Sequence, residues 1–128
     1  MRFVLPFAVL FLAQALLVSS QLPRSYEKDV EPIFLRECAD CHGGAKPKKG
    51  LDLSQGKGYA NLVGRKSNQV PELSLVEPGK LEQSYLWQKL QHTAKEGKGM
   101  PRGIFSSRKL AQEQLAVIGE WIQQGANP

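Results

Sequence analysis

Both cysteines of the chain and one of its two histidines fall within the segment CADCH, residues 38–42. Cysteine sulfur and imidazole nitrogen are ligands for soft and borderline metals, and two thiols at this spacing can also form a redox pair. Because three reactive side chains gather in five residues, they are expected to serve one site. The rest of the chain must then fold around that site.

Residues 1–20 are typical of a secretory signal peptide. The basic Arg2 precedes an apolar run over residues 3–18, and small residues follow, which suits cleavage between Ser20 and Gln21. The run is shorter than the about 20 apolar residues of a bilayer span, although a retained membrane anchor is the alternative. We therefore expect a periplasmic or otherwise extracytoplasmic protein.

After cleavage, residues 21–128 would form one small domain, since they are too few for two. The whole chain has 17 Lys and Arg against 12 Asp and Glu, a formal net charge of +5. The basic residues are spread through the segments KPKKG, KEGKG and SSRK without interleaved aromatic residues. This pattern does not favour nucleic-acid binding.

Hydrophobic spacing predicts an all-α fold with three helices and one long loop. The expected helices cover residues 25–38, 85–92 and 111–124, and the loop of residues 43–79 holds one short helical turn at 59–64. The first helix would carry Cys38 and Cys41 on the same apolar stripe as Phe34. Ser84 is expected to cap the second helix, whereas Ala111 would cap the third poorly.

The long loop is rich in Gly, Pro, Lys and Ser, yet it also contains many aliphatic residues. These are Leu51, Leu53, Leu62, Val63, Val70, Leu73, Leu75 and Val76. Three short helices would offer too little surface to bury them all. We therefore expect the loop to wrap around an apolar group, and a large apolar cofactor would meet this need.

Three kinds of site can explain CADCH. A zinc ion would need Cys38, Cys41, His42 and the distant His92, a set without the second spaced pair of structural zinc sites. A dithiol or disulfide suits an oxidising compartment but explains neither the histidine nor the apolar loop. Covalent haem attachment explains all three residues, because each sulfur adds to a vinyl group and the adjacent imidazole binds the iron.

Haem attachment raises the question of the second axial ligand. If His42 binds one face of the iron, Met100 in GKGMPRG is the expected ligand on the other face, because the only other methionine is Met1. A methionine can instead fill a gap in a core. In that case His92 or a lysine of KEGKG would be the alternative ligand.

In the order of these motifs the chain resembles the monohaem c-type cytochromes, and more narrowly the small planctomycete-type domains. The motifs that carry the resemblance lie within residues 25–126 and are VEPIF, CADCH, GLDLS, YANLV, VEPGK, SYLWQKL, GMP and LAVIGEWIQQGA. The resemblance implies a cytochrome c fold over residues 21–128, with the first and last helices crossing and one covalent haem c. It assigns thioether bonds to Cys38 and Cys41, proximal iron ligation to His42 and distal ligation to Met100.

Two functions follow from this assignment. With two fixed axial ligands the chain would be an electron carrier, and no enzymatic activity is expected. The alternative is a haem enzyme or ligand sensor, such as a peroxidase with a displaceable distal ligand. A carrier would dock transiently on redox partner proteins, and an acidic partner surface would be attracted by Lys46, Lys48, Lys49, Lys95 and Lys98.

Overall fold

The computed structural model describes residues 22–102 and 108–128. The helical elements are the π-helical turn η1 (Tyr26–Val30), α1 (Glu31–Glu37), the 3₁₀ turn η2 (Lys48–Gly50), α2 (Gly58–Leu62), the 3₁₀ turn η3 (Leu81–Gln83), α3 (Tyr85–Gln91) and α4 (Gln112–Gln123). In the described residues β structure is limited to isolated bridges. The predicted all-α class is confirmed, whereas the predicted signal peptide, residues 1–20, lies outside the described residues.

The N-terminal helix ends before both cysteines. Its η1 turn continues directly into α1, which ends at Glu37 because Cys38 leaves the helical conformation, with φ −129°. The amides of Cys41 and His42 both donate to the Cys38 carbonyl, at 3.1 and 2.8 Å. The prediction that the helix carries Cys38 and Cys41 on its apolar stripe is therefore wrong, since both thiols belong to the turn that follows α1.

Helix α3 covers the predicted segment, but its first residue is not capped as predicted. Ser84 occupies the N-cap position, yet its hydroxyl makes no capping bond. It instead accepts a hydrogen bond from Glu77 N (2.9 Å) and donates to the Lys80 carbonyl (3.0 Å). At the other end His92 adopts the left-handed conformation (φ 62°, ψ 32°), which ends the helix.

Helix α4 agrees with the third predicted helix to within one residue at each end. At its start Gln114 Oε1 accepts a hydrogen bond from the Ala111 amide (3.0 Å), which is one half of a capping box. Alanine has no side-chain acceptor for the other half. The weak cap expected at Ala111 is confirmed.

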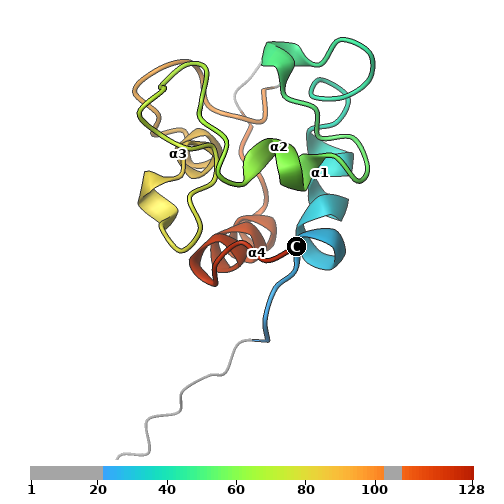
Figure 1. Cartoon of the computed structure of the whole chain (residues 1–128), viewed down its shortest axis with the longest axis vertical. Helices are drawn as coiled ribbons and strands as arrows, with labels where there is room; N and C mark the ends of the chain where they lie inside the picture. The colour runs from blue at the N-terminus through green and yellow to red at the C-terminus, as the bar shows by residue number, and fades with distance from the viewer. Residues whose placement is uncertain (1–21, 103–107) are drawn as a thin grey trace, which may run out of the picture.

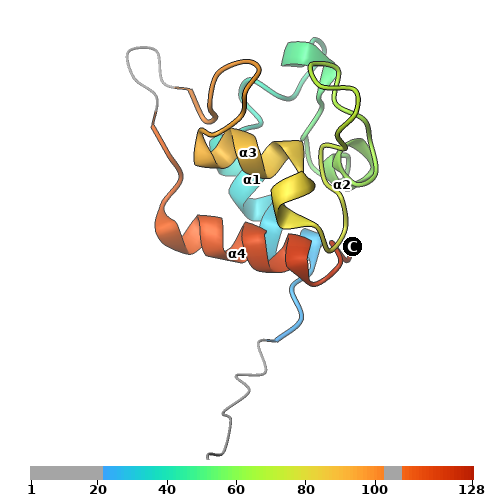
Figure 2. The same cartoon turned by 90° about the vertical axis from the view of Figure 1, so that its left-hand side faces the viewer.

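The first and last helices cross, as the resemblance implied, and their contact forms the core (Figure 2). The fully buried Trp121 lies 5.5 Å from the Tyr26 ring, centroid to centroid. The Asn127 carbonyl accepts hydrogen bonds from the Tyr26 amide (2.9 Å) and from Trp121 Nε1 (2.7 Å). The start and end of the domain therefore lie side by side (Figure 1). Other buried residues of these helices are Val30, Ile33, Phe34, Leu115, Ile118 and Ile122.

Most of the long loop lies on the side of the molecule away from α4 (Figure 1). Leu53, Leu62 and Val76 are buried. The buried Glu31 carboxylate of α1 accepts a hydrogen bond from Gly56 N (2.6 Å), which fixes the loop to the first helix. The prediction of an ordered loop is confirmed, and the predicted turn at 59–64 corresponds to α2. The prediction that this turn is the only one is wrong, because the loop also contains the 3₁₀ turn η2.

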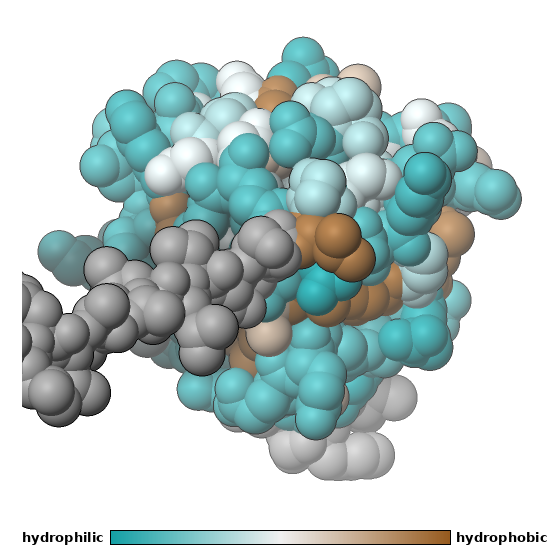
Figure 3. Space-filling model, turned by 90° about the horizontal axis from the view of Figure 1, so that it is seen from below, coloured by the Kyte–Doolittle hydropathy of each residue, from teal (hydrophilic) through white to brown (hydrophobic). Residues whose placement is uncertain are grey.

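The surface opposite the loop is mostly hydrophilic, with hydrophobic residues gathered in a narrow band (Figure 3). Among the described residues, Leu22 is the large hydrophobic residue with a mostly exposed side chain, at 83%. The helices of the described ranges are too short or too polar to cross a lipid bilayer.

Candidate functional site

A cavity of about 490 Å³ opens between the CADCH turn, the long loop, α3 and Met100. Its volume lies in the range of about 300–1,000 Å³ that is usual for cofactor and ligand sites. Its apolar wall consists of Leu51, Leu53, Leu62, Leu75, Leu86 and Leu90, of which the first four come from the loop. The loop therefore wraps around an apolar space, as its leucines predicted.

His42 lines the cavity, and a hydrogen bond to the Lys48 backbone orients its ring. Its Nδ1 is 3.1 Å from the Lys48 carbonyl, which can only accept, so Nδ1 carries the proton and Nε2 keeps a free lone pair. Burial lowers the pKa of His42, which favours the neutral imidazole, and the bond to Lys48 opposes this shift. A neutral ring with a fixed tautomer is the form that binds a metal.

The turn that carries His42 is tied to the loop on both sides. Lys48 N donates to the Cys41 carbonyl (2.9 Å), and Leu53 N donates to the His42 carbonyl (2.6 Å). These bonds explain why the chain leaves α1 at Cys38. They also fix the backbone of the motif relative to the leucine wall.

The two thiols have different surroundings. Cys38 lines the cavity, whereas Cys41 is exposed and is not part of the lining. Burial, followed by the nearby Glu37, raises the pKa of Cys38 to about 12. Dithiol catalysts need a lowered thiol pKa, so this geometry disfavours the redox-dithiol alternative. Both cysteines are free thiols in the structure.

Met100 reaches the same cavity from a distant part of the chain. Its amide donates to the Lys89 carbonyl (2.9 Å), and its carbonyl lies 3.1 Å from His92 Nε2. The His92 ring therefore binds the backbone of the Met100 segment and does not line the cavity. Of the predicted site residues, the structure brings Cys38, His42 and Met100 around one space and leaves Cys41 and His92 beside it.

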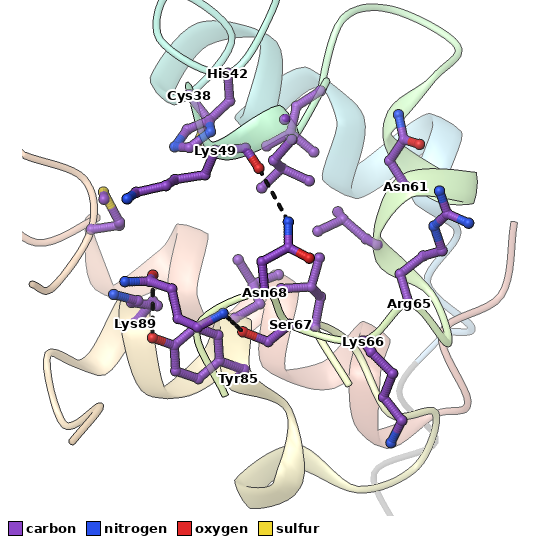
Figure 4. A pocket seen from close by; sticks show the side chains of 18 of the residues that line it. Cys38, His42, Lys49, Asn61, Arg65, Lys66, Ser67, Asn68, Tyr85 and Lys89 are labelled. Atoms are coloured by element: carbon purple, nitrogen blue, oxygen red, sulfur yellow. Dashed lines mark hydrogen bonds between the residues drawn. The ribbon is translucent and has the colours of Figure 1, made fainter. Parts of the chain in front are cut away.

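Apart from thiol, imidazole and phenol groups, the acid–base side chains of the described cavity lining are all cationic (Figure 4). They are Lys49, Arg65, Lys66 and Lys89, and neither Asp nor Glu lies among the described lining residues. Burial lowers the pKa of Lys89, as do the neighbouring cations Lys49 and Arg102. The cavity is therefore positive as well as apolar.

Most of these cations were not predicted from the sequence. Lys89 could have been found, because it follows Leu86 by three residues and so lies on the apolar side of its helix. Arg65 and Lys66 lie in the long loop, where no periodicity shows which side chains face inward. Asn68 was missed for the same reason, although its Nδ2 lies 3.5 Å from the Lys49 carbonyl across the cavity (Figure 4).

This donor set fits a haem. Thiol, imidazole and thioether are the groups that hold haem c, the leucines suit a porphyrin ring, and the cations suit its two carboxylate groups. The zinc alternative lacks this support, because the described residues contain no group of three or more His, Cys, Asp or Glu placed to hold a metal ion.

Comparisons with known proteins show the fold and the family of this chain. Among solved structures, a chain of Kuenenia stuttgartiensis hydrazine synthase is similar, with 23% identity and a TM-score of 0.57 over 85% of this chain. This chain corresponds to 17% of that one, and at this identity the likeness shows the fold alone. No curated protein matches. The family model described as Planctomycete cytochrome C matches residues 38–102, half of the chain and the part that carries the cavity, so the chain belongs to this cytochrome c family.

Proposed function

We propose that the chain is an electron-transfer protein with one covalently bound haem c. Family membership supports haem binding and electron transfer. For the finer assignment, Cys38 and Cys41 would form the thioether bonds, and His42 and Met100 would be the axial ligands. The observation that carries it is the shared cavity, because Cys38, His42 and Met100 meet there from segments far apart in the sequence.

The haem iron would supply one-electron chemistry between its ferrous and ferric forms. The residues of this chain would do the rest. His42 would bind through Nε2 while its Nδ1 hydrogen bond keeps the ring in place. The leucine wall would exclude water, and Lys49, Arg65 and Lys66 would pair with the carboxylate groups.

We also propose that the protein works outside the cytoplasm and docks transiently on redox partners with acidic surfaces. The signal-like residues 1–20 support the first part. Exposed lysines near the two ligand segments support the second, and they are Lys46, Lys48, Lys49, Lys95 and Lys98. Of these, Lys49 reaches the cavity lining itself.

The ligand assignment is tested by replacing Met100 with leucine, which keeps an apolar side chain of similar size but has no sulfur. In holo-protein made with a cytochrome maturation system, Met100→Leu should remove the ferric sulfur-to-iron charge-transfer band and lower the reduction potential. His92→Gln, which keeps a donor for the Met100 carbonyl, should retain the band. A wild-type spectrum without the band, altered only by His92→Gln, would show bis-histidine ligation instead.

A haem enzyme or ligand sensor remains the second candidate function. The similar chain of hydrazine synthase comes from an enzyme by its name. Against this candidate, the described cavity lining holds no carboxylate to assist bond cleavage. Because Met100 would occupy the distal position, ferric wild-type protein should bind cyanide slowly. Rapid binding of cyanide or peroxide would favour the enzyme or sensor.

A further inference from the structure

Lys89 of α3 is a buried lysine whose ammonium donates hydrogen bonds to backbone carbonyl groups. Its side chain is almost wholly buried, with the residue 7% exposed. Its Nζ donates to the carbonyls of Glu96 (3.1 Å) and Lys98 (2.9 Å). A buried ammonium needs hydrogen-bond acceptors to offset its lost hydration. Here the chain segment just before Met100 supplies them.

Other bonds join the same segment to the same helix. The Tyr85 hydroxyl donates to the Glu96 carbonyl (2.7 Å), and the Met100 amide donates to the Lys89 carbonyl (2.9 Å). His92 holds the Met100 carbonyl at 3.1 Å. Residues 96–100 are therefore fixed to α3 and its C-cap at several points, and Lys89 makes the largest share of the side-chain bonds.

Two glycines allow this close approach. Gly97 has φ +71°, and a Cβ there would collide with Lys89 Nζ. A Cβ on Gly99 would collide with the His92 ring. The sequence KEGKGM thus has its smallest residues where the segment packs against the helix, which indicates that the position of this segment is specified.

We propose that Lys89 is a positioning residue for Met100, and that its ammonium keeps residues 96–100 against α3 so that external ligands cannot easily displace the Met100 sulfur. This inference rests on the proposed function. Loss of the Lys89 ammonium should therefore turn an inert carrier into a protein that binds added ligands. Lys89 acts through the backbone of the segment and is not itself a ligand.

The experiment compares holo-protein of the wild type, Lys89→Met and Lys95→Met. The first variant keeps the length and apolar stem of the side chain and removes the ammonium. The control removes the exposed ammonium of Lys95, which directly precedes residues 96–100. Amide hydrogen exchange over residues 96–100 and the rate of cyanide binding to ferric protein are measured, together with the charge-transfer band.

Lys89→Met should speed both exchange and cyanide binding by about tenfold or more, because two carbonyls lose a charged donor. Lys95→Met should change neither. Tyr85→Phe should shift exchange in the same direction by less. Rates in Lys89→Met equal to those of the wild type would overturn the proposal. If Lys89→Met gives no folded holo-protein, Lys89→Gln decides by the same exchange measurement.

The two hypotheses fail in different ways. A wild type without the charge-transfer band contradicts Met100 ligation, and the exchange data still decide whether Lys89 holds residues 96–100. A wild type with the band, and with exchange unaffected by Lys89→Met, contradicts the positioning role alone.

Discussion

At the scale of single residues, the Tyr26 hydroxyl is a polar group enclosed by close packing. It is buried without a hydrogen-bond partner among the described residues, and burial raises the pKa of Tyr26. A Cβ on Gly58 would collide with this same hydroxyl. The core therefore packs closely around a hydroxyl oxygen that forms no hydrogen bond with the described residues.

Tyr26→Phe should therefore stabilise the holo-protein by about 1 kcal/mol, because the cost of the unpaired hydroxyl disappears. Gly58→Ala should cost about 1–3 kcal/mol in the wild type through overpacking, and less when it is combined with Tyr26→Phe. Urea unfolding of the four proteins in this cycle measures both effects. Additive effects of the two substitutions would contradict the contact.

Asp52 illustrates how local hydrogen bonds make the stability of the protein depend on pH. Hydrogen bonds from Ser54 and Lys57 lower the pKa of Asp52 to about 2. A carboxyl whose pKa falls on folding stabilises the protein above its unfolded pKa of about 4, and this contribution is lost as the pH falls towards 2. Asp52→Asn should thus be less stable than the wild type at pH 7.

The difference in urea midpoint between the wild type and Asp52→Asn should shrink between about pH 4 and pH 2. Glu72→Gln, a change at an exposed carboxylate, serves as the control and should have little effect. A difference that stays constant with pH would assign the loss of stability to something other than the ionised carboxylate.

At the scale of elements, helix α4 lacks one half of its N-terminal capping box, and a substitution can supply it. Ala111 has the extended backbone of a cap (φ −60°, ψ 152°) and is exposed, and Gln114 already makes half of the capping box. Ala111→Ser should stabilise the protein by about 1 kcal/mol. The matched change Ala116→Ser, at an exposed site within the helix, should not stabilise it. Thermal unfolding of both variants makes the comparison.

The helices also show how far local patterns could be predicted. Apolar spacing placed α3 and α4 closely, because their boundaries depend on residues within one turn of the helix. The end of α1 could not be predicted in this way, since the apolar stripe continues through Cys38. Hydrogen bonds from Lys48 and Leu53 to the following turn favour its end, and these depend on the folded loop. Ser84 occupies the predicted N-cap position, but the absence of its capping bond could not be predicted for the same reason, because its hydroxyl binds the preceding segment.

At the scale of the whole molecule, the proposed docking surface predicts a salt dependence. The rate of oxidation of the ferrous protein by ferricyanide, an anion, should fall as ionic strength rises from low to physiological values. Lys46→Glu and Lys95→Glu should lower the rate at low salt. Lys28→Glu, on η1 and outside the two ligand segments, should lower it less. A rate that does not depend on salt would remove the steering hypothesis.

The candidate site was only partly predictable because its residues differ in how they are brought together. Cys38 and His42 lie in one five-residue motif, and Met100 could be proposed because the chain has so little sulfur. Arg65 and Lys66 reach the cavity only through the path of the long loop. Their part in the site needed the three-dimensional arrangement.

The pairing of the first and last segments through the Asn127 carbonyl bears on how such a domain can be used in larger proteins. Because Tyr26 and Asn127 are hydrogen-bonded neighbours, a host chain could enter and leave the domain at almost one point. Such a domain can be inserted into a surface loop of a host protein without moving the two ends of that loop apart. The same geometry makes the chain a suitable scaffold for circular permutation, with new ends opened elsewhere on its surface.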